Sequence, residues 1–136
     1  KVKQLFAYLH PNGTTPEGLC FEAIQKQLIP ATNDSDSYFL NFSDGEPCYS
    51  INNGGDDIYY RGDAAAKHTR KQVKKMQASG INVLSYFITD MSEDRFERSS
   101  DWEIFKKCYG KDAKYVNVEN MMQVAKTMNE MFLTKI

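Results

Sequence analysis

The sequence has few histidines and cysteines, which limits the metal and redox chemistry that it can support. Its 136 residues include two histidines, His10 and His68, and three cysteines, Cys20, Cys48 and Cys108. The cysteines are widely spaced with no Cys-x-x-Cys pair, and two isolated histidines are too few for a typical zinc site. We expect free thiols, with Cys20 and Cys108 buried or half-buried, and we expect surface or packing roles for both histidines.

The sequence also lacks long apolar runs and an excess of either charge. No run approaches the roughly 18 apolar residues that a membrane-spanning helix needs, and residues 1–10 have no signal-peptide pattern. The formal net charge is −1, with 41% hydrophobic and 26% charged residues. This balance is typical of a soluble globular protein with no overall attraction to nucleic acid or anionic membranes. We therefore expect a single cytoplasmic domain over residues 1–136.

The order of apolar segments predicts an α/β protein. Apolar runs rich in β-branched and aromatic residues predict strands over residues 38–42, 81–88 and 115–118. Helical periodicity predicts helices over residues 2–9, 14–28, 64–79, 101–109 and 119–136, and residues 48–63 are interpreted as a long polar loop. This alternation favours a parallel, doubly wound, Rossmann-like sheet with helices on both faces and all strands ending at one rim.

Two of these helices carry more detailed signals. In the first, Thr15 is the expected N-cap before Pro16, and the inward stripe is expected to be Leu19, Cys20, Ala23, Ile24 and Leu28. In the second, which Gly80 is expected to terminate, the inward residues are Ala65, Thr69, Val73 and Met76, and the outward ones are Lys67, Arg70, Lys71, Lys74 and Lys75.

Oxygen-bearing side chains follow the first predicted strand. Ser43, Asp44 and Glu46 lie directly after it, and ligands of open parallel sheets bind beyond the carboxyl ends of the strands. Carboxylate and hydroxyl oxygens suit Mg²⁺, and Thr15 could add another oxygen. Two simpler interpretations stay open at this point: Asp44-Gly45 is an ordinary turn, and Thr15 only caps a helix.

Two segments together carry a family resemblance. The pairing of GTTPEGL (residues 13–19) with FSDGEP (residues 42–47) resembles the von Willebrand factor A (VWA) domain. The Thr15-Pro16 step is similar to that of the metal-chelatase members. The order of SDGEP, a basic helix, INVLSYFI and AKYVNVENMMQVAKTMNEMF is similar to the C-terminal VWA region of the cobaltochelatase accessory subunit.

The resemblance implies a metal-ion-dependent adhesion site (MIDAS). Thr15 matches the threonine ligand of the family and Asp44 its second-motif aspartate, with Ser43 beside it. The first motif, Asp-x-Ser-x-Ser, is absent from these residues. We therefore expect a partial domain, the back half of the fold, whose site for Mg²⁺ or Mn²⁺ needs further residues to be complete.

The resemblance also implies a function through binding. Such a module grips a protein partner, which in chelatase-like systems is a ring-forming AAA+ ATPase, and by itself does no catalysis. We expect Glu46, Tyr59, Tyr60 and Arg61 to contact the partner, because Tyr and Arg are common at interface hot spots. A first strand left at the sheet edge could also associate with another strand.

Other functions have weaker support in the sequence. A receiver-like phospho-switch would use Asp44 as the acceptor and Thr89 as the switch hydroxyl, but it needs a lysine where YVNVEN supplies Glu119 and Asn120. The basic helix over residues 67–75 could contact nucleic acid, although a solvated face is the simpler interpretation. The sequence has no recognisable motif with a nucleophile beside a base, and it has no glycine-rich phosphate loop. It therefore gives little support to catalysis by the chain itself.

Overall fold

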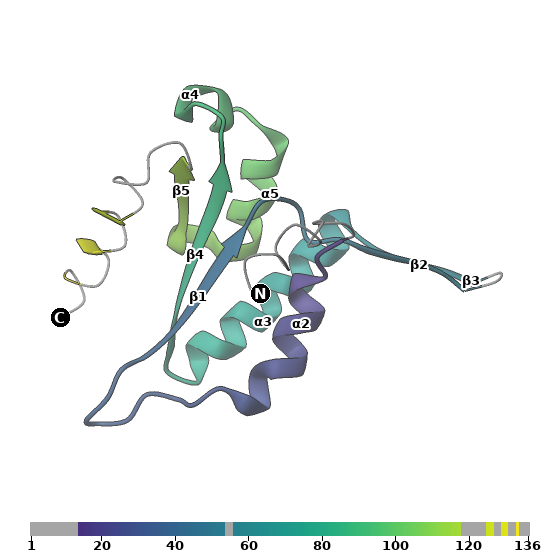
Figure 1. Ribbon diagram of the computed structural model, residues 1–136. Coiled ribbons are helices and arrows are strands. Elements are labelled where there is room, and N and C mark those ends of the chain that lie inside the picture. The colour runs from purple at the N-terminus through teal and green to yellow at the C-terminus, as the bar shows by residue number, and fades with distance from the viewer. Residues whose placement is uncertain (1–13, 54–55, 118–124, 127–128, 131–132, 134–136) are drawn as a thin grey trace, which may run out of the picture.

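The computed structural model describes residues 14–53, 56–117, 125–126, 129–130 and 133. These residues form an α/β fold built on a parallel sheet of three strands in the order β1-β4-β5 (Figure 1). The strands are β1 (Ser37–Ser43), β4 (Ile81–Thr89) and β5 (Ala113–Asn117), and the α-helices are α2 (Glu17–Ile24), α3 (Gly62–Ala78), α4 (Glu93–Phe96) and α5 (Ser100–Tyr109). Short 3₁₀ turns η2 (Gln25–Gln27) and η3 (Gly110–Asp112) follow α2 and α5. The helix predicted over residues 2–9 lies outside the described residues. Of the helix predicted over residues 119–136, only residues 125–126, 129–130 and 133 are described, and these are helical.

The strand register confirms the predicted parallel sheet. β1 pairs with β4 from Ser37 opposite Ile81 to Ser43 opposite Phe87. β5 pairs with the other side of β4, ending at Thr89 opposite Asn117. Residues 83–87 of the central strand are all buried, in keeping with its almost continuous apolar sequence. The carboxyl ends of the three strands therefore lie at one rim.

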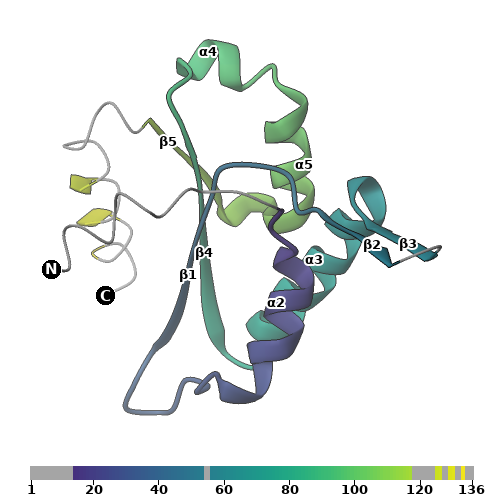
Figure 2. The same cartoon turned by 45° about the vertical axis from the view of Figure 1, so that its right-hand side comes forward.

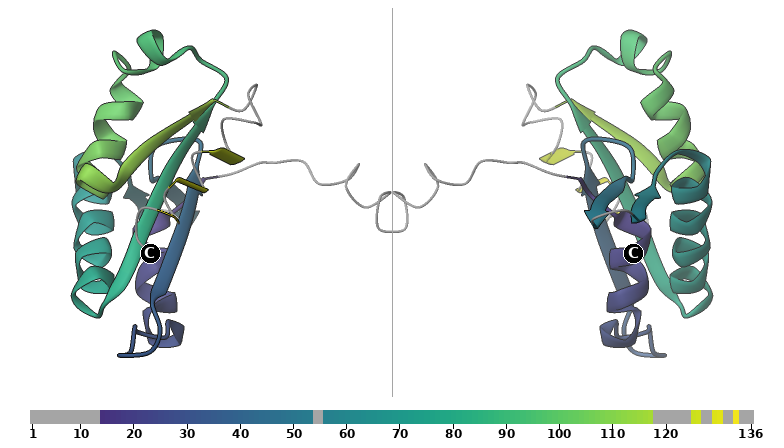
Figure 3. Two further views of the ribbon diagram at one scale, coloured as in Figure 1. Left: turned by 90° about the vertical axis from the view of Figure 1, so that its left-hand side faces the viewer. Right: turned by 90° about the vertical axis from the view of Figure 1, so that its right-hand side faces the viewer.

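Helices α2, α3 and α5 pack against one face of the sheet, which is visible edge-on in Figure 3. The main core joins Val83 and Phe87 of β4 to Phe21 of α2, Val73 of α3 and Phe105 of α5. Helix α3 connects β1 to β4, and α5 connects β4 to β5. Two right-handed crossovers that advance in the same direction place their helices on the same face. The expected cover of the second face depends on residues 119–136, most of which lie outside the described residues.

Helix α3 largely follows the predicted pattern. All four residues expected to face inward are buried, and its four lysines are exposed. Gly80, just after the helix, has a φ of +81°, the left-handed conformation that suits a helix terminator. Arg70 departs from the prediction because its side chain is half-buried beside α5 instead of exposed.

Helix α2 differs from the prediction at its start and in its buried face. It begins at Glu17, with Pro16 in the capping position and no side-chain cap, so Thr15 is not the N-cap. Glu17, Gly18 and Phe21 are buried, whereas Leu19 and Cys20 are exposed. The helix turns its glycine toward α3 because only a residue without a side chain permits this close approach.

The interpretation of residues 48–63 as a long loop is wrong. Strands β2 (Tyr49–Asn53) and β3 (Asp56–Tyr60) form an antiparallel hairpin, and Asn53 pairs with Asp56. Only Gly54 and Gly55 separate the strands, and two glycines are among the preferred connections of a two-residue hairpin. The hairpin projects away from the sheet and helices (Figure 2).

No helix in the described parts of the chain is long and apolar enough to cross a membrane. The three cysteines are free, as predicted, but only Cys108 is buried, whereas Cys48 is half-buried and Cys20 is exposed.

The cysteines give a prediction for thiol reactivity. Burial, aided by the negative charge of Glu17, raises the pKa of the Cys108 thiol to about 12. Because the thiolate is the reactive form, an alkylating reagent at pH 8 is expected to label Cys20 and to spare Cys108 until the protein unfolds. Folding favours the neutral Cys108 thiol, so its contribution to stability is complete below its unfolded pKa and is lost as pH rises toward 12. Mass spectrometry of the labelled peptides checks this, and rapid labelling of native Cys108 would contradict it.

Candidate functional site at the carboxyl rim of the sheet

The end of β1 places one buried hydroxyl and one exposed carboxylate side by side. Ser43, the last residue of the strand, is buried, and its Oγ donates a hydrogen bond to the Gly45 carbonyl over 3.2 Å. Asp44 follows it and is exposed. The serine hydroxyl therefore stabilises the turn, and the turn presents Asp44 to solvent at the rim.

Backbone hydrogen bonds bring Thr15 to the same rim. The Thr15 carbonyl accepts from the backbone N–H of Glu17 at 2.9 Å and of Cys48 at 3.0 Å. The second bond ties the segment before α2 to the turn after β1, although 33 residues separate its two ends in the sequence. The Thr15 side chain is exposed. The exposed Thr15 therefore lies on a surface beside the segment that follows β1.

A buried carboxylate that sequence reasoning missed lies beneath this surface. Glu17 is only 4% exposed, and its Oε2 accepts a hydrogen bond of 2.7 Å from the Tyr109 hydroxyl. The same hydroxyl accepts from Asn41 Nδ2 over 2.8 Å. An acidic residue in the first turn of a helix is usually explained by the helix dipole, so the sequence carried no sign that this one is buried.

The environment of Glu17 favours its neutral form. Burial raises the pKa of its carboxyl, and the negative charge of Asp44 acts in the same direction. Hydrogen bonds from Ser43, Tyr109 and Asn41 oppose this shift. Burial and the neighbouring Glu17 also raise the pKa of the Tyr109 hydroxyl, which keeps it a donor. The rim therefore rests on a rigid polar network of β1, α2 and α5.

Two of the four residues expected to contact a partner are engaged inside the protein. The Gly62 N–H, at the start of α3, donates to Glu46 Oε1 over 2.6 Å. The Tyr60 hydroxyl lies 3.0 Å from His68 Nδ1 and 3.3 Å from the Ala65 carbonyl, to which it donates. Glu46 thus stabilises the N-terminus of α3, and Tyr60 fastens the hairpin to that helix. His68 has the packing role expected of it.

The other two residues are exposed at the base of the hairpin. Tyr59 is 63% exposed, and the guanidinium carbon of Arg61 lies 5.7 Å from the centre of its ring. Both line a shallow cavity of about 160 Å³ together with Thr14 and Cys48. Because Cys48 also bonds to Thr15, Tyr59 and Arg61 lie on the side of the rim nearest to Thr15.

The candidate metal ligands Thr15, Ser43 and Asp44 include a single carboxylate. Within the described ranges, no group of three or more His, Cys, Asp or Glu side chains could hold a metal ion. Thr89, proposed as a switch hydroxyl, lies at the end of β4, and its Oγ1 accepts from the Met91 N–H over 3.2 Å. That hydroxyl caps the turn after β4.

A scan against protein-family models finds no match to this chain, and neither the search of curated proteins nor the search of solved structures finds one. The functional interpretation therefore depends on the geometry of the rim and on the sequence resemblance.

Proposed function

We propose that this protein is a VWA-type binding module that uses the rim at the end of β1 to hold a divalent cation, Mg²⁺ or Mn²⁺, shared with a protein partner. Asp44 would supply the carboxylate ligand, and Thr15 and Ser43 would supply hydroxyl oxygens directly or through water. The cation would link the rim to a carboxylate of the partner. Residues outside this sequence would complete its coordination.

The observation that supports this proposal best is the hydrogen bond from the Cys48 N–H to the Thr15 carbonyl. It joins Thr15 to Cys48, the residue that follows FSDGEP, and so holds together the two segments that resemble the adhesion motif, near the carboxyl end of a parallel strand. Ligands of such sheets bind at this end. Asp44 and Thr15 are both exposed there, and Mg²⁺ commonly binds through one or two carboxylates while keeping several waters.

The partner surface would extend from the rim to Tyr59 and Arg61. An exposed tyrosine with a guanidinium over its ring presents a large contact area at low entropic cost. The resemblance to chelatase subunits favours a ring-forming AAA+ ATPase as the partner, with ATP hydrolysis in the partner and none in this chain.

Paramagnetic Mn²⁺ provides a test that detects even weak binding. Added to isotope-labelled protein, it is expected to broaden the NMR signals of Thr15 and of residues 43–45 before those of other residues. Replacing Asp44 with alanine should weaken the binding by about tenfold or more, because it removes the only carboxylate of the proposed ligand set.

Asp36 provides the matched control, because it is exposed and lies just before β1, at the opposite end of the strand. An Asp36→Ala variant should keep the broadening at residues 43–45. Equal broadening around all exposed carboxylates, unchanged by Asp44→Ala, would reduce Asp44 to an ordinary turn residue.

A further inference from the structure

The outer side of α3 carries a concentration of positive charge that the rim does not use. Lys67, Lys71, Lys74 and Lys75 are exposed, and none of them forms an ion pair with a carboxylate of the described residues. The protein as a whole has a net charge of −1. The charge of this helix is therefore a local feature, and its lysines are available to a ligand.

Arg70, in the middle of the same helix, has an unsatisfied donor. Its Nη1 is buried and has no hydrogen-bond partner among the described residues. A buried N–H without an acceptor is unfavourable, because it has lost its hydrogen bonds to water. Arginine also has donors arranged in a planar fork that matches the oxygens of phosphate or carboxylate. The described residues therefore supply no acceptor to this atom, and the positive charge of the guanidinium is not neutralised by any of their carboxylates.

Gly110 explains why the guanidinium stays in this position. A Cβ on Gly110 would lie 2.8 Å from Arg70 Nη2 and 2.9 Å from Nη1. Gly110 has a φ of +67° and directly follows α5, at the negative end of its dipole. The glycine gives the guanidinium room, and the helix end favours its charge without taking up the free donor.

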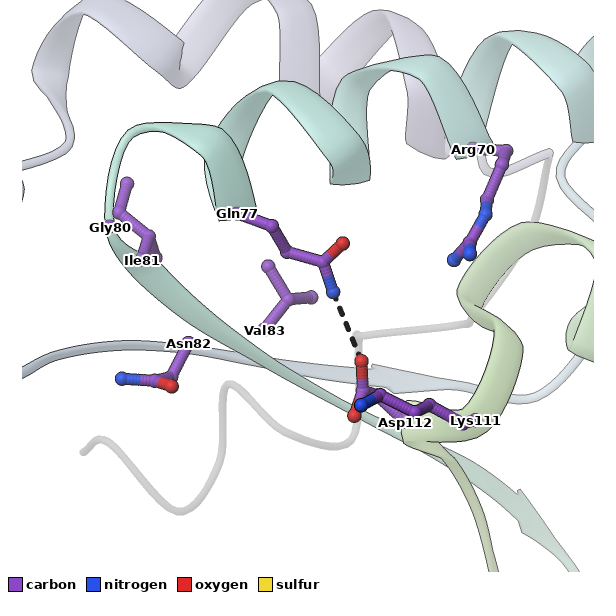
Figure 4. Close-up of a pocket in the computed structure, with 8 residues that line it drawn as sticks. All are labelled: Arg70, Gln77, Gly80, Ile81, Asn82, Val83, Lys111 and Asp112. Carbon is purple, nitrogen blue, oxygen red and sulfur yellow. Dashed lines mark hydrogen bonds between the residues drawn. The ribbon is translucent and has the colours of Figure 1, made fainter. Parts of the chain in front are cut away.

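Arg70 lines three neighbouring cavities. The first, of about 500 Å³, also contains Gln77, Lys111 and Asp112 (Figure 4), and there Gln77 Nε2 donates to Asp112 Oδ2 over 3.0 Å. The second, of about 430 Å³, contains Asp63, which forms an ion pair with Lys107. Each of these two cavities therefore has a carboxylate that weakens its attraction for an anion.

The third cavity lacks this opposing charge. Its volume is about 490 Å³, and its described lining residues are Lys67, Arg70, Lys71, Lys74, Lys75 and Ala78. Five basic residues of α3 line this open depression, and their combined positive charge suits a ligand with more than one negative charge. A phosphate group carries up to two charges and three strong acceptor oxygens.

We propose that Arg70 and the lysines of α3 form a binding site for a small phosphorylated molecule. None of the described residues that line the three cavities is aromatic, so the site has no platform on which nucleic-acid bases could stack. This absence favours a small ligand over single-stranded RNA or DNA. The site is formed by α3, away from Asp44, and does not depend on the cation proposal.

Calorimetric titration with inorganic diphosphate tests the site. Binding is expected, and Arg70→Gln should weaken it by about tenfold or more. Lys26→Gln is the matched control, because Lys26 is an exposed lysine of η2 that lines none of the three cavities, and it should bind as the natural sequence does. If Arg70→Gln does not fold, the Lys71→Gln/Lys74→Gln double variant replaces it, since both lysines are exposed.

Three results would overturn the proposal. One is equal weakening by Lys26→Gln and by the variants of α3, which would indicate attraction by net charge alone. Another is equally tight binding of a dicarboxylate with the same charge, which would remove the preference for phosphate. The last is binding of single-stranded RNA more tightly than diphosphate at the same salt concentration, which would assign this surface to nucleic acid.

Discussion

Replacing Phe96 with alanine is expected to lower the free energy of unfolding by about 3–5 kcal/mol, as is typical of a buried phenylalanine. Phe96 has no exposed surface, although it belongs to a helix of only four residues. Its ring centre lies 4.5 Å from that of Phe87, 5.0 Å from that of Tyr115 and 5.1 Å from that of Trp102. The side chain thus fastens the segment after β4 to both β4 and β5, and its removal leaves a cavity among aromatic rings.

Chemical denaturation followed by fluorescence or circular dichroism measures this loss. Arg95→Ala provides the control, because Arg95 is exposed and precedes Phe96 in the same short helix. Its effect should stay within about 0.5 kcal/mol. A loss below about 1 kcal/mol for Phe96→Ala would mean that α4 does not close this part of the core.

The second large effect is expected at Gly18, where alanine should destabilise the protein by about 1–3 kcal/mol. A Cβ at this position would lie 2.3 Å from the Tyr60 hydroxyl oxygen and 2.9 Å from the backbone nitrogen of Thr69. The tyrosine could move, but the backbone of α3 cannot yield without separating the two helices. Helix propensity alone would favour alanine over glycine by about 1 kcal/mol. A loss of stability in Gly18→Ala would therefore show that the steric clash with α3 outweighs the gain in helix propensity.

Gly45 offers a matched comparison for this substitution. A Cβ on Gly45 would meet no atom within 4 Å, and its φ is not positive. Gly45→Ala should therefore leave the melting temperature almost unchanged, whereas Gly18→Ala should lower it by several degrees, as expected for a domain of this size. A higher melting temperature for Gly18→Ala would show that α2 and α3 do not pack closely at this position.

The sheet and α3 could be predicted because their sequence signals are local and strong. Residues 81–88 are long, apolar and rich in β-branched and aromatic side chains, and such a segment is stable only as a buried strand. In α3, the inward positions recur with helical spacing and Gly80 follows the last turn. The hairpin was missed despite Gly54-Gly55, because its strands are polar and do not show a clear apolar alternation.

The sequence by itself determined the alternation of helices and strands, their parallel order and the delivery of Asp44 to the rim, since each follows from side-chain periodicity and from the handedness of the chain. Only the tertiary structure decided which face of α2 is buried, that Glu17 lies in the interior beside Tyr109, and that the Arg70 guanidinium rests on Gly110. Each of these depends on a contact between residues at least 40 positions apart. Such contacts depend on how closely two backbones approach and on which polar groups they enclose. The local sequence pattern of either segment does not specify these features.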